Sequence, residues 1–155
     1  MIFIGIIGLV FLTDYLVKKK AEETLKEGVV REVAGDRILL RKLHNEGIAF
    51  GMFAKRDEVT ILGTAILLGG MLSEFVRIVF KKGNTILKIG YALLIGGGLN
   101  NLHDRYFKGY VTDYFSFNVK WEKLRRLVFN LSDMFVLIGA ILITLGKVVG
   151  LKKVK

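Results

Sequence analysis

The sequence predicts a membrane protein that is mainly α-helical, with four transmembrane helices and a small β-hairpin or sheet platform between the first and second helices. Hydrophobic residues make up 52% of the 155 residues, and the mean hydropathy is +0.47. The charged residues cluster between long apolar runs, whose lengths approach the roughly 17–25 helical residues that cross a bilayer. We therefore expect a single integral membrane domain over residues 1–155.

Four apolar segments are the expected spans, at residues 2–17, 59–80, 85–102 and 129–149. The first is unlike a cleaved secretory signal, because no basic region precedes it and Lys18, Lys19 and Lys20 follow it in place of a small-residue cleavage site. We expect it to be retained as a helix. The chain has no proline, so a break in any of these helices has to come from glycine.

The polar segment 18–58 is too long to be a simple connector, and it is the expected extramembrane platform. Residues 29–33 and 37–40 flank Ala34-Gly35-Asp36, which predicts two short strands around a turn. After the third span, residues 110–117 alternate aromatic and polar side chains, and residues 121–126 combine Trp121 with basic residues. The second of these stretches suits the headgroup region of a membrane.

Composition excludes several classes of function. Without cysteine the chain cannot form a disulfide framework, a thiolate nucleophile or a cysteine metal site. His44 and His103 are its only histidines, so we expect no zinc site, and we expect no cofactor. The net charge is +10, but the basic residues flank apolar segments and no nucleic-acid-binding module is recognisable. Membrane lipids with anionic headgroups, rather than nucleic acid, are the expected counter-charge.

The distribution of basic residues leaves the orientation in the membrane open. An even number of spans places both termini on one side. Of the 24 Lys and Arg residues, ten lie in 18–58 and six in 102–127, against eight elsewhere. The positive-inside rule would place the termini outside, although eight acidic residues dilute the charge of segment 18–58.

Charged side chains in or beside a span are costly in lipid, so they normally face the bundle interior and serve a purpose. Asp14 and Lys18 are four residues apart, which favours a helical ion pair. An interfacial pair that ends the first helix explains these two residues equally well.

A second polar group lies at the end of the third span. Asn101, Asp104 and Arg105 share one helical face, just after Gly96-Gly97-Gly98. Three glycines in a row let a neighbouring helix or a substrate backbone approach closely. Helix capping and helix packing are the structural alternatives for this segment.

Two further aspartates have the spacing of a candidate catalytic pair. Asn130 and Asp133 are expected to share a helical face about one turn into the fourth span, and Asp113 precedes Asp133 by twenty residues. Two carboxylates brought together at a membrane surface share a proton. Such a pair can hydrolyse a peptide through water. A proton relay, or an ion pair with Arg105, would have the same sequence pattern.

Several motifs follow one another in the order found in lipoprotein signal peptidases, and the chain resembles that family from its first span to its last. The motifs are 14–18, Asn45-Glu46-Gly47-Ile48-Ala49-Phe50, Asn101-Leu102-His103-Asp104-Arg105, Gly109-Tyr110-Val111-Thr112-Asp113-Tyr114 and Phe129-Asn130-Leu131-Ser132-Asp133. The resemblance implies an aspartic endopeptidase of the bacterial cell membrane that removes the signal peptide of a prolipoprotein, cutting before a cysteine that carries diacylglycerol. It also implies cytoplasmic termini, an extracytoplasmic platform, a site at the outer membrane surface, and inhibition by cyclic peptides such as globomycin.

The resemblance assigns a role to each motif residue. Asp113 and Asp133 match the catalytic aspartates. The residues expected to bind substrate or shape the site are Asn45, Gly98, Asn101, Arg105 and Asn130, and the residues expected to be structural are Asp14, Lys18 and Asp104.

Four positions depart from the usual pattern of the family. Ile48 and Ser132 stand where alanine is common, Asn100 where glycine is common and Thr112 where valine is common. Asn100 is expected to add bulk near the site, and Ser132 to alter its hydrogen bonding. Two other functions are compatible with the residues: a small proton- or ion-conducting membrane protein that uses the carboxylates as a relay, and a non-catalytic lipid- or lipoprotein-binding scaffold of the same fold.

Overall fold

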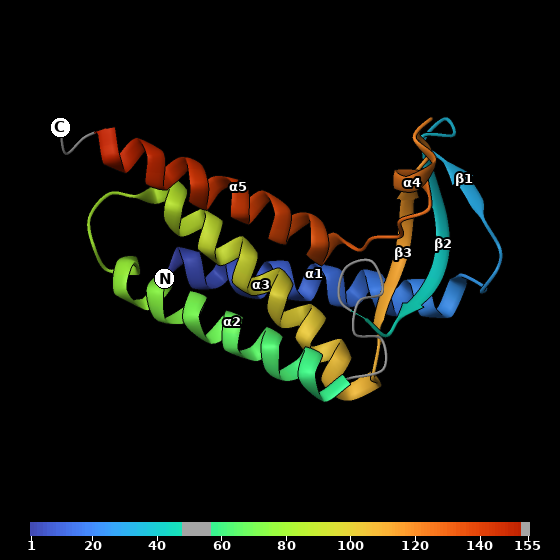
Figure 1. Ribbon diagram of the computed structural model, residues 1–155, viewed down its shortest axis with the longest axis horizontal. Coiled ribbons are helices and arrows are strands. Elements are labelled where there is room, and N and C mark those ends of the chain that lie inside the picture. The colour runs from blue at the N-terminus through green and yellow to red at the C-terminus, as the bar shows by residue number, and fades with distance from the viewer. Residues whose placement is uncertain (48–56, 153–155) are drawn as a thin grey trace.

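The computed structural model describes residues 1–47 and 57–152, and it is mainly helical with one small antiparallel sheet. In chain order the elements are α1 (Ile2–Thr24), β1 (Arg31–Val33), β2 (Ile38–Asn45), α2 (Asp57–Val79), α3 (Thr85–Lys108), β3 (Val111–Phe117), α4 (Glu122–Arg125) and α5 (Leu131–Lys152). The long helices α1, α2, α3 and α5 lie side by side, with the sheet at one end and both termini toward the other (Figure 1).

Two of the long helices have the length and composition of membrane spans. They are Glu58–Val79 and Leu131–Val148, with mean hydropathies of 1.8 and 1.9. Few of their side chains are buried inside the protein. The central helix α3 is more polar because its buried side chains include Lys88, Asn100 and Asp104. The four spans predicted from the sequence are therefore supported by composition for α2 and α5, and the count of four stays a prediction.

The three consecutive glycines explain how α3 contacts three helices at once. Successive helical residues point about 100° apart, and each glycine faces a different neighbour. A Cβ atom at Gly96 would lie 2.9 Å from Val10 Cβ of α1, and one at Gly98 would lie 2.5 Å from Leu68 Cδ2 of α2. At Gly97 it would lie 2.6 Å from the Ser132 carbonyl oxygen of α5. Helix packing, the structural alternative, thus accounts for all three glycines.

The predicted hairpin is confirmed, and a third strand joins it. In β1 and β2, Val33 pairs with Ile38 across a turn in which Ala34, Gly35 and Asp36 all have positive φ. The strand order is β1-β2-β3, so the 110–117 segment completes the sheet. The platform therefore extends beyond 18–58, because β3 comes from the chain after α3.

The boundaries of all four long helices differ from the sequence prediction; α2, for example, covers Asp57–Val79 in place of 59–80. Helix α1 continues from 17 to Thr24, because its Lys, Ala and Glu residues favour helix and no glycine occurs between Gly8 and Gly28. Helix α3 continues to Lys108 and ends at Gly109, whose φ of 81° is the left-handed conformation common after a helix. Helix α5 begins at Leu131, so Asn130 precedes the helix and does not lie within its first turn.

We expect Gly97→Ala to lower stability by about 1–3 kcal/mol, since the new methyl group would overlap the α5 backbone and force the helices apart. Thermal unfolding in detergent micelles measures this change. Gly70→Ala is the matched control, because a Cβ there meets nothing within 4 Å. Equal unfolding midpoints for the two variants would contradict the close α3–α5 contact.

Candidate active site

A group of buried polar side chains lies where the helices meet the sheet. Burial of charged and amide groups is tolerated only when hydrogen bonds or opposite charges satisfy them. The group comprises Asp14, Lys18, Asn100, Asn101, Asp104, Thr112, Asp113, Asn130 and Ser132, each with at most 9% of its surface exposed. It includes six of the ten site residues predicted from the sequence, whereas Asn45, Gly98, Arg105 and Asp133 are only partly buried.

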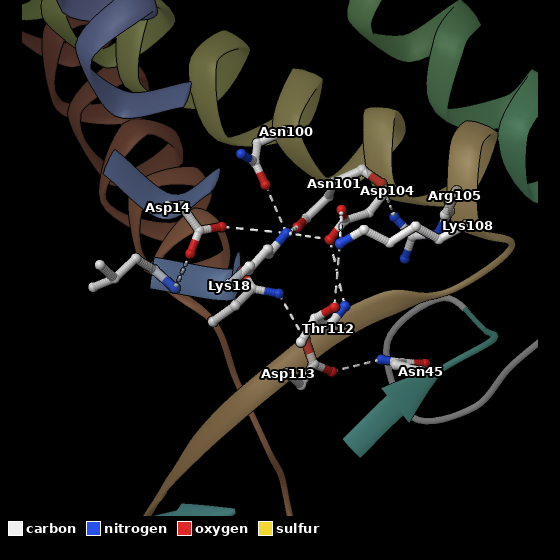
Figure 2. A network of polar contacts seen from close by, with 12 residues as sticks. Asp14, Lys18, Asn45, Asn100, Asn101, Asp104, Arg105, Lys108, Thr112 and Asp113 are labelled. Carbon is white, nitrogen blue, oxygen red and sulfur yellow. Dashed lines mark hydrogen bonds and ion pairs between the residues drawn. The ribbon is translucent and has the colours of Figure 1, made fainter. Parts of the chain in front are cut away.

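Lys18 lies at the centre of this group, with 1% of its surface exposed. Its Nζ is 2.9 Å from Asp104 Oδ2 and 3.2 Å from Asp14 Oδ2. It also donates to the side-chain oxygens of Asn100 and Asn101, at 2.6 and 2.7 Å (Figure 2). The predicted Asp14–Lys18 pair is confirmed, but it is buried within the bundle and does not end the helix.

Asp14 extends the group from α1 to β3 and α5. Its Oδ1 accepts hydrogen bonds from the Tyr114 hydroxyl at 2.8 Å and from the Leu131 amide at 3.2 Å. Sequence reasoning missed Tyr114, although a buried phenol adjoining Asp113 in the sequence needs a polar partner. Because Leu131 is the first residue of α5, these bonds fix the start of that helix against α1 and the sheet.

Asp104 connects the end of α3 to the start of β3. Besides Lys18, it binds Lys108 Nζ at 2.8 Å and accepts a long hydrogen bond, 3.4 Å, from the Thr112 amide. The residue after Thr112 is Asp113, so this contact helps to fix the position from which the Asp113 side chain projects.

Asp113 is held by two amide side chains. Asn45 of β2 donates to its Oδ2 at 3.0 Å, and Asn130 donates to its Oδ1 at 2.6 Å (Figure 2 shows the Asn45 bond). Both carboxyl oxygens are therefore fixed from opposite sides. Neither donor carries a formal charge, so Asp113 can hold or release a proton without breaking an ion pair.

Asp133 and Asn130 form a capping box at the start of α5. The Asn130 side chain accepts from the Asp133 amide at 2.9 Å, and the Asp133 carboxylate accepts from the Asn130 amide at 3.2 Å. The sequence predicted instead that both residues lie within the helix and share one of its faces. Asn101 of α3 donates to Asp133 Oδ1 at 2.9 Å. Asn130 therefore contacts both aspartates.

Asp113 and Asp133 line one cavity of about 380 Å³. Its other polar lining residues are Asn45 and Arg105, and the rest of the lining is apolar: Val111, Leu127, Val128, Phe129, Val136, Leu137 and Ala140. Arg105 donates to the carbonyl oxygens of Gly47 and Asn101 at 3.0 and 3.4 Å. Such a cavity can receive an extended apolar chain and present its backbone to two carboxyl groups.

The environment of Asp113 changes its protonation. Burial, and next the charge of Asp133, raise its pKa from 3.8 to about 7, against the lowering effect of the hydrogen bonds from Asn45 and Asn130. Between those two pH values the folded protein binds a proton that the unfolded chain has released. This carboxyl therefore favours folding most at low pH, and its contribution is lost as the pH rises toward 7.

The four positions that depart from the family pattern have different surroundings. Asn100 binds Lys18 and the Phe11 carbonyl oxygen, so it belongs to the buried network and does not line the cavity. Thr112 donates to Glu22 Oε1 at 2.8 Å. Ser132 is fully buried, and its hydroxyl has no hydrogen-bond partner within the described residues. Ile48 lies outside the described residues.

The four aspartates of the site gather where the helices meet the sheet. Asp14 lies midway along α1, Asp104 toward the end of α3, Asp113 in β3 and Asp133 in the first turn of α5. A relay through the bundle would require carboxylates along the length of the helices. This arrangement suits chemistry at one membrane surface better.

Comparison with known proteins identifies close similarities over nearly the whole chain. Residues 6–149 match the family described as signal peptidase (SPase) II. The chain is 33% identical to a lipoprotein signal peptidase of Halothermothrix orenii, over 94% of this chain and 93% of that one. It is 29% identical to a lipoprotein signal peptidase of Fusobacterium nucleatum, over 92% and 84%. A solved structure of a bacterial membrane enzyme matches with a TM-score of 0.84 at 26% identity, over 99% of this chain and 91% of the other.

We expect Lys18→Met to destabilise the protein by about 3–5 kcal/mol, because Asp14 and Asp104 would remain buried without their shared cation. The midpoint of thermal unfolding in micelles measures the loss. Lys19→Met removes the same charge from the exposed neighbouring position and should leave the midpoint near that of the unchanged protein. Similar midpoints for both variants would show that the buried ammonium group is dispensable.

Proposed function

Because the chain belongs to the signal peptidase II family, aspartic-type peptidases that remove signal peptides from prolipoproteins, we propose that Asp113 and Asp133 are its catalytic pair. The observation that carries this assignment is the shared cavity, which both carboxyl groups line and which amide side chains surround. The pKa of Asp113, raised to about 7, supports it, since one proton is then available at neutral pH.

The pair hydrolyses the peptide bond with one proton between its two carboxyl groups. The protonated member donates to the carbonyl oxygen of the scissile bond, while the ionised member takes a proton from the attacking water. The C–N bond then breaks, the water oxygen stays in the new carboxylate, and the leaving amine takes up a proton. We assign the proton to Asp113, because the N-terminus of α5 favours negative charge on Asp133. The rate should therefore fall as the pH rises through about 7 and Asp113 ionises.

The remaining motif residues position this pair or shape the cavity. Asn45 and Asn130 orient Asp113, Asn101 orients Asp133, and Arg105 lines the cavity, where it can bind a substrate carbonyl group. Gly98 acts indirectly, by letting α2 pack against α3. The structural role of Asp14, Lys18 and Asp104 is to hold α1, α3 and β3 together.

The substrate proposed for this cavity is a prolipoprotein segment ending at a diacylglyceryl cysteine. The apolar lining along α5 and residues 127–129 supports an apolar signal peptide beside the acyl chains. Burial of acyl chains in the bilayer contributes roughly 0.8 kcal/mol per CH₂ and would hold the scissile bond at the depth of the carboxylates. Membrane lipids would surround the helices, and a cyclic peptide such as globomycin would inhibit by filling the same cavity.

We further propose that α1, α2, α3 and α5 all span the bacterial cell membrane as one domain, with both termini in the cytoplasm. The side-by-side arrangement of the four helices and the position of the termini away from the sheet support this topology (Figure 1). The sheet and the catalytic pair would then lie at the extracytoplasmic face. This orientation opposes the one given by the count of basic residues.

Asp113→Asn and Asp133→Asn should each abolish cleavage of a diacylglyceryl precursor peptide by the purified protein, since an amide keeps the shape but cannot exchange the proton. Both variants should still fold, as measured by their elution as a single species in detergent. Turnover near that of the unchanged protein by either variant would overturn the assignment. The same reaction should proceed unchanged with a chelator, and loss of activity that zinc restores would indicate a metallopeptidase.

After Lys155, which is proposed to be cytoplasmic, a fused fluorescent protein should be active and a fused phosphatase inactive. Beside Gly35, which is proposed to be extracytoplasmic, the phosphatase should be active and the fluorescent protein inactive. Paired phosphatase and fluorescent-protein fusions expressed in bacteria measure both positions. The reverse pattern would support the charge count and place the catalytic pair on the wrong side of the membrane for prolipoproteins.

A further inference from the structure

A second polar cluster lies behind the catalytic cavity, around Glu22 in the last turns of α1. Its Oε1 accepts from the Thr112 hydroxyl at 2.8 Å and lies 2.9 Å from His44 Nε2. Its Oε2 lies 3.3 Å from Lys42 Nζ. One carboxylate thus receives bonds from both β2 and β3. Neither Glu22 nor these three partners lines the cavity that contains the aspartate pair.

The register of the strands connects this cluster to Asp113. His44 and Thr112 are directly paired across β2 and β3. Successive side chains of a strand point to opposite faces. The next residues, Asn45 and Asp113, therefore project away from Glu22, and they are joined by the 3.0 Å hydrogen bond. Each strand is held on one face by Glu22 and presents a member of the catalytic site on the other.

We propose that Glu22 is a positioning residue for the catalytic pair, fixing β2 and β3 against α1 so that Asp113 stays within hydrogen-bond reach of Asn45 and Asn130. This inference rests on the proposed function of Asp113. Thr112 is essential to the contact in this chain, because valine, the usual residue of the family pattern at this position, has no hydroxyl to donate.

The groups around Glu22 favour its charged form. Partial burial raises its pKa, but the hydrogen bond from Thr112, the charge of His44 and the bond from Lys42 outweigh burial, and the net pKa is lowered. Charge-assisted hydrogen bonds of this kind are stronger than neutral ones. Two further charged groups face the cluster: Lys108 of α3 lies 3.5 Å from the Thr112 hydroxyl, and Glu27 lies 3.2 Å from His44 Nδ1.

The test compares Glu22→Ala and Thr112→Val with Glu23→Ala. Glu23 carries the same charge on the same helical turn, but it is exposed. Among the described residues, its side chain makes no hydrogen bond or ion pair of the kind that Glu22 makes. Cleavage of the diacylglyceryl precursor is followed in micelles across pH, with rates expressed per folded protein. Glu22→Ala and Thr112→Val should each lower kcat about tenfold with little change in KM, because the Asp113 carboxyl group is displaced while substrate binding is retained.

The pH dependence separates positioning from general stability. The bonds from Asn45 and Asn130 lower the pKa of Asp113, so weakening them should move the alkaline fall in rate to higher pH in both variants. The charged groups that interact with Asp113 include Asp133 of α5, Arg105 of α3 and Lys18 of α1, and the variants leave all three in place. Glu22→Gln, whose amide oxygen can still accept from Thr112, should recover part of kcat. The Glu22→Ala, Thr112→Val double variant should be no slower than the slower single variant, since both single variants already remove the hydrogen bond between Thr112 and Glu22.

Two results would overturn this inference. One is an unchanged kcat and pH profile in Glu22→Ala. The other is a variant that loses only its yield or unfolding midpoint, while each folded molecule keeps the normal rate and pH profile. Normal cleavage by the Asp113→Asn variant, in contrast, would contradict the proposed catalytic function of Asp113, and not only the positioning role of Glu22.

Discussion

The ammonium group of Lys18 lies within 3.2 Å of four side-chain oxygens from α1 and α3, in a site that solvent barely reaches. A charge buried in this way costs several kcal/mol in lost hydration, and only well-placed partners offset that cost. The packing of α1 against α3 must therefore keep all four oxygens in position. Through Asn101 the network reaches Asp133, and through Asp104 it reaches the backbone just before Asp113. The geometry of the proposed catalytic pair thus depends on one fixed cation.

Asn130 gives the site its second constraint, because one side chain serves two functions. Its oxygen caps α5, and its nitrogen donates to Asp113. The start of helix α5 and the orientation of a strand carboxyl group are therefore coupled. The two aspartates differ in environment as a result: Asp133 lies in the first turn of a helix, whereas Asp113 lies in a buried strand between two uncharged donors. The proposed mechanism uses this asymmetry, with the charge on Asp133 and the proton on Asp113.

The sequence predicted the contacts that local periodicity controls. Spacings of three and four residues correctly grouped Asp14 with Lys18 and Asn101 with Asp104, and the turn residues 34–36 correctly indicated the hairpin. Contacts between distant segments carry no such signal. The pairing of β3 with β2, the bonds of Tyr114 to α1 and those of Thr112 to Glu22 join residues far apart in sequence. The position of Asn130 within the fourth helix was predicted wrongly for a related reason, since spacing alone does not show whether a residue caps a helix or lies within it.

Carbon-13 NMR of labelled aspartate carboxyl groups in micelles tests the shared proton most directly, with Asp113 assigned by comparison with Asp113→Asn. The Asp113 carboxyl should titrate near pH 7. Since the charge of Asp133 raises this pKa, the titration should move to lower pH in Asp133→Asn. An Asp113 carboxyl that is already ionised at about pH 5, or one whose titration is the same with and without Asp133, would contradict a proton shared between the two aspartates.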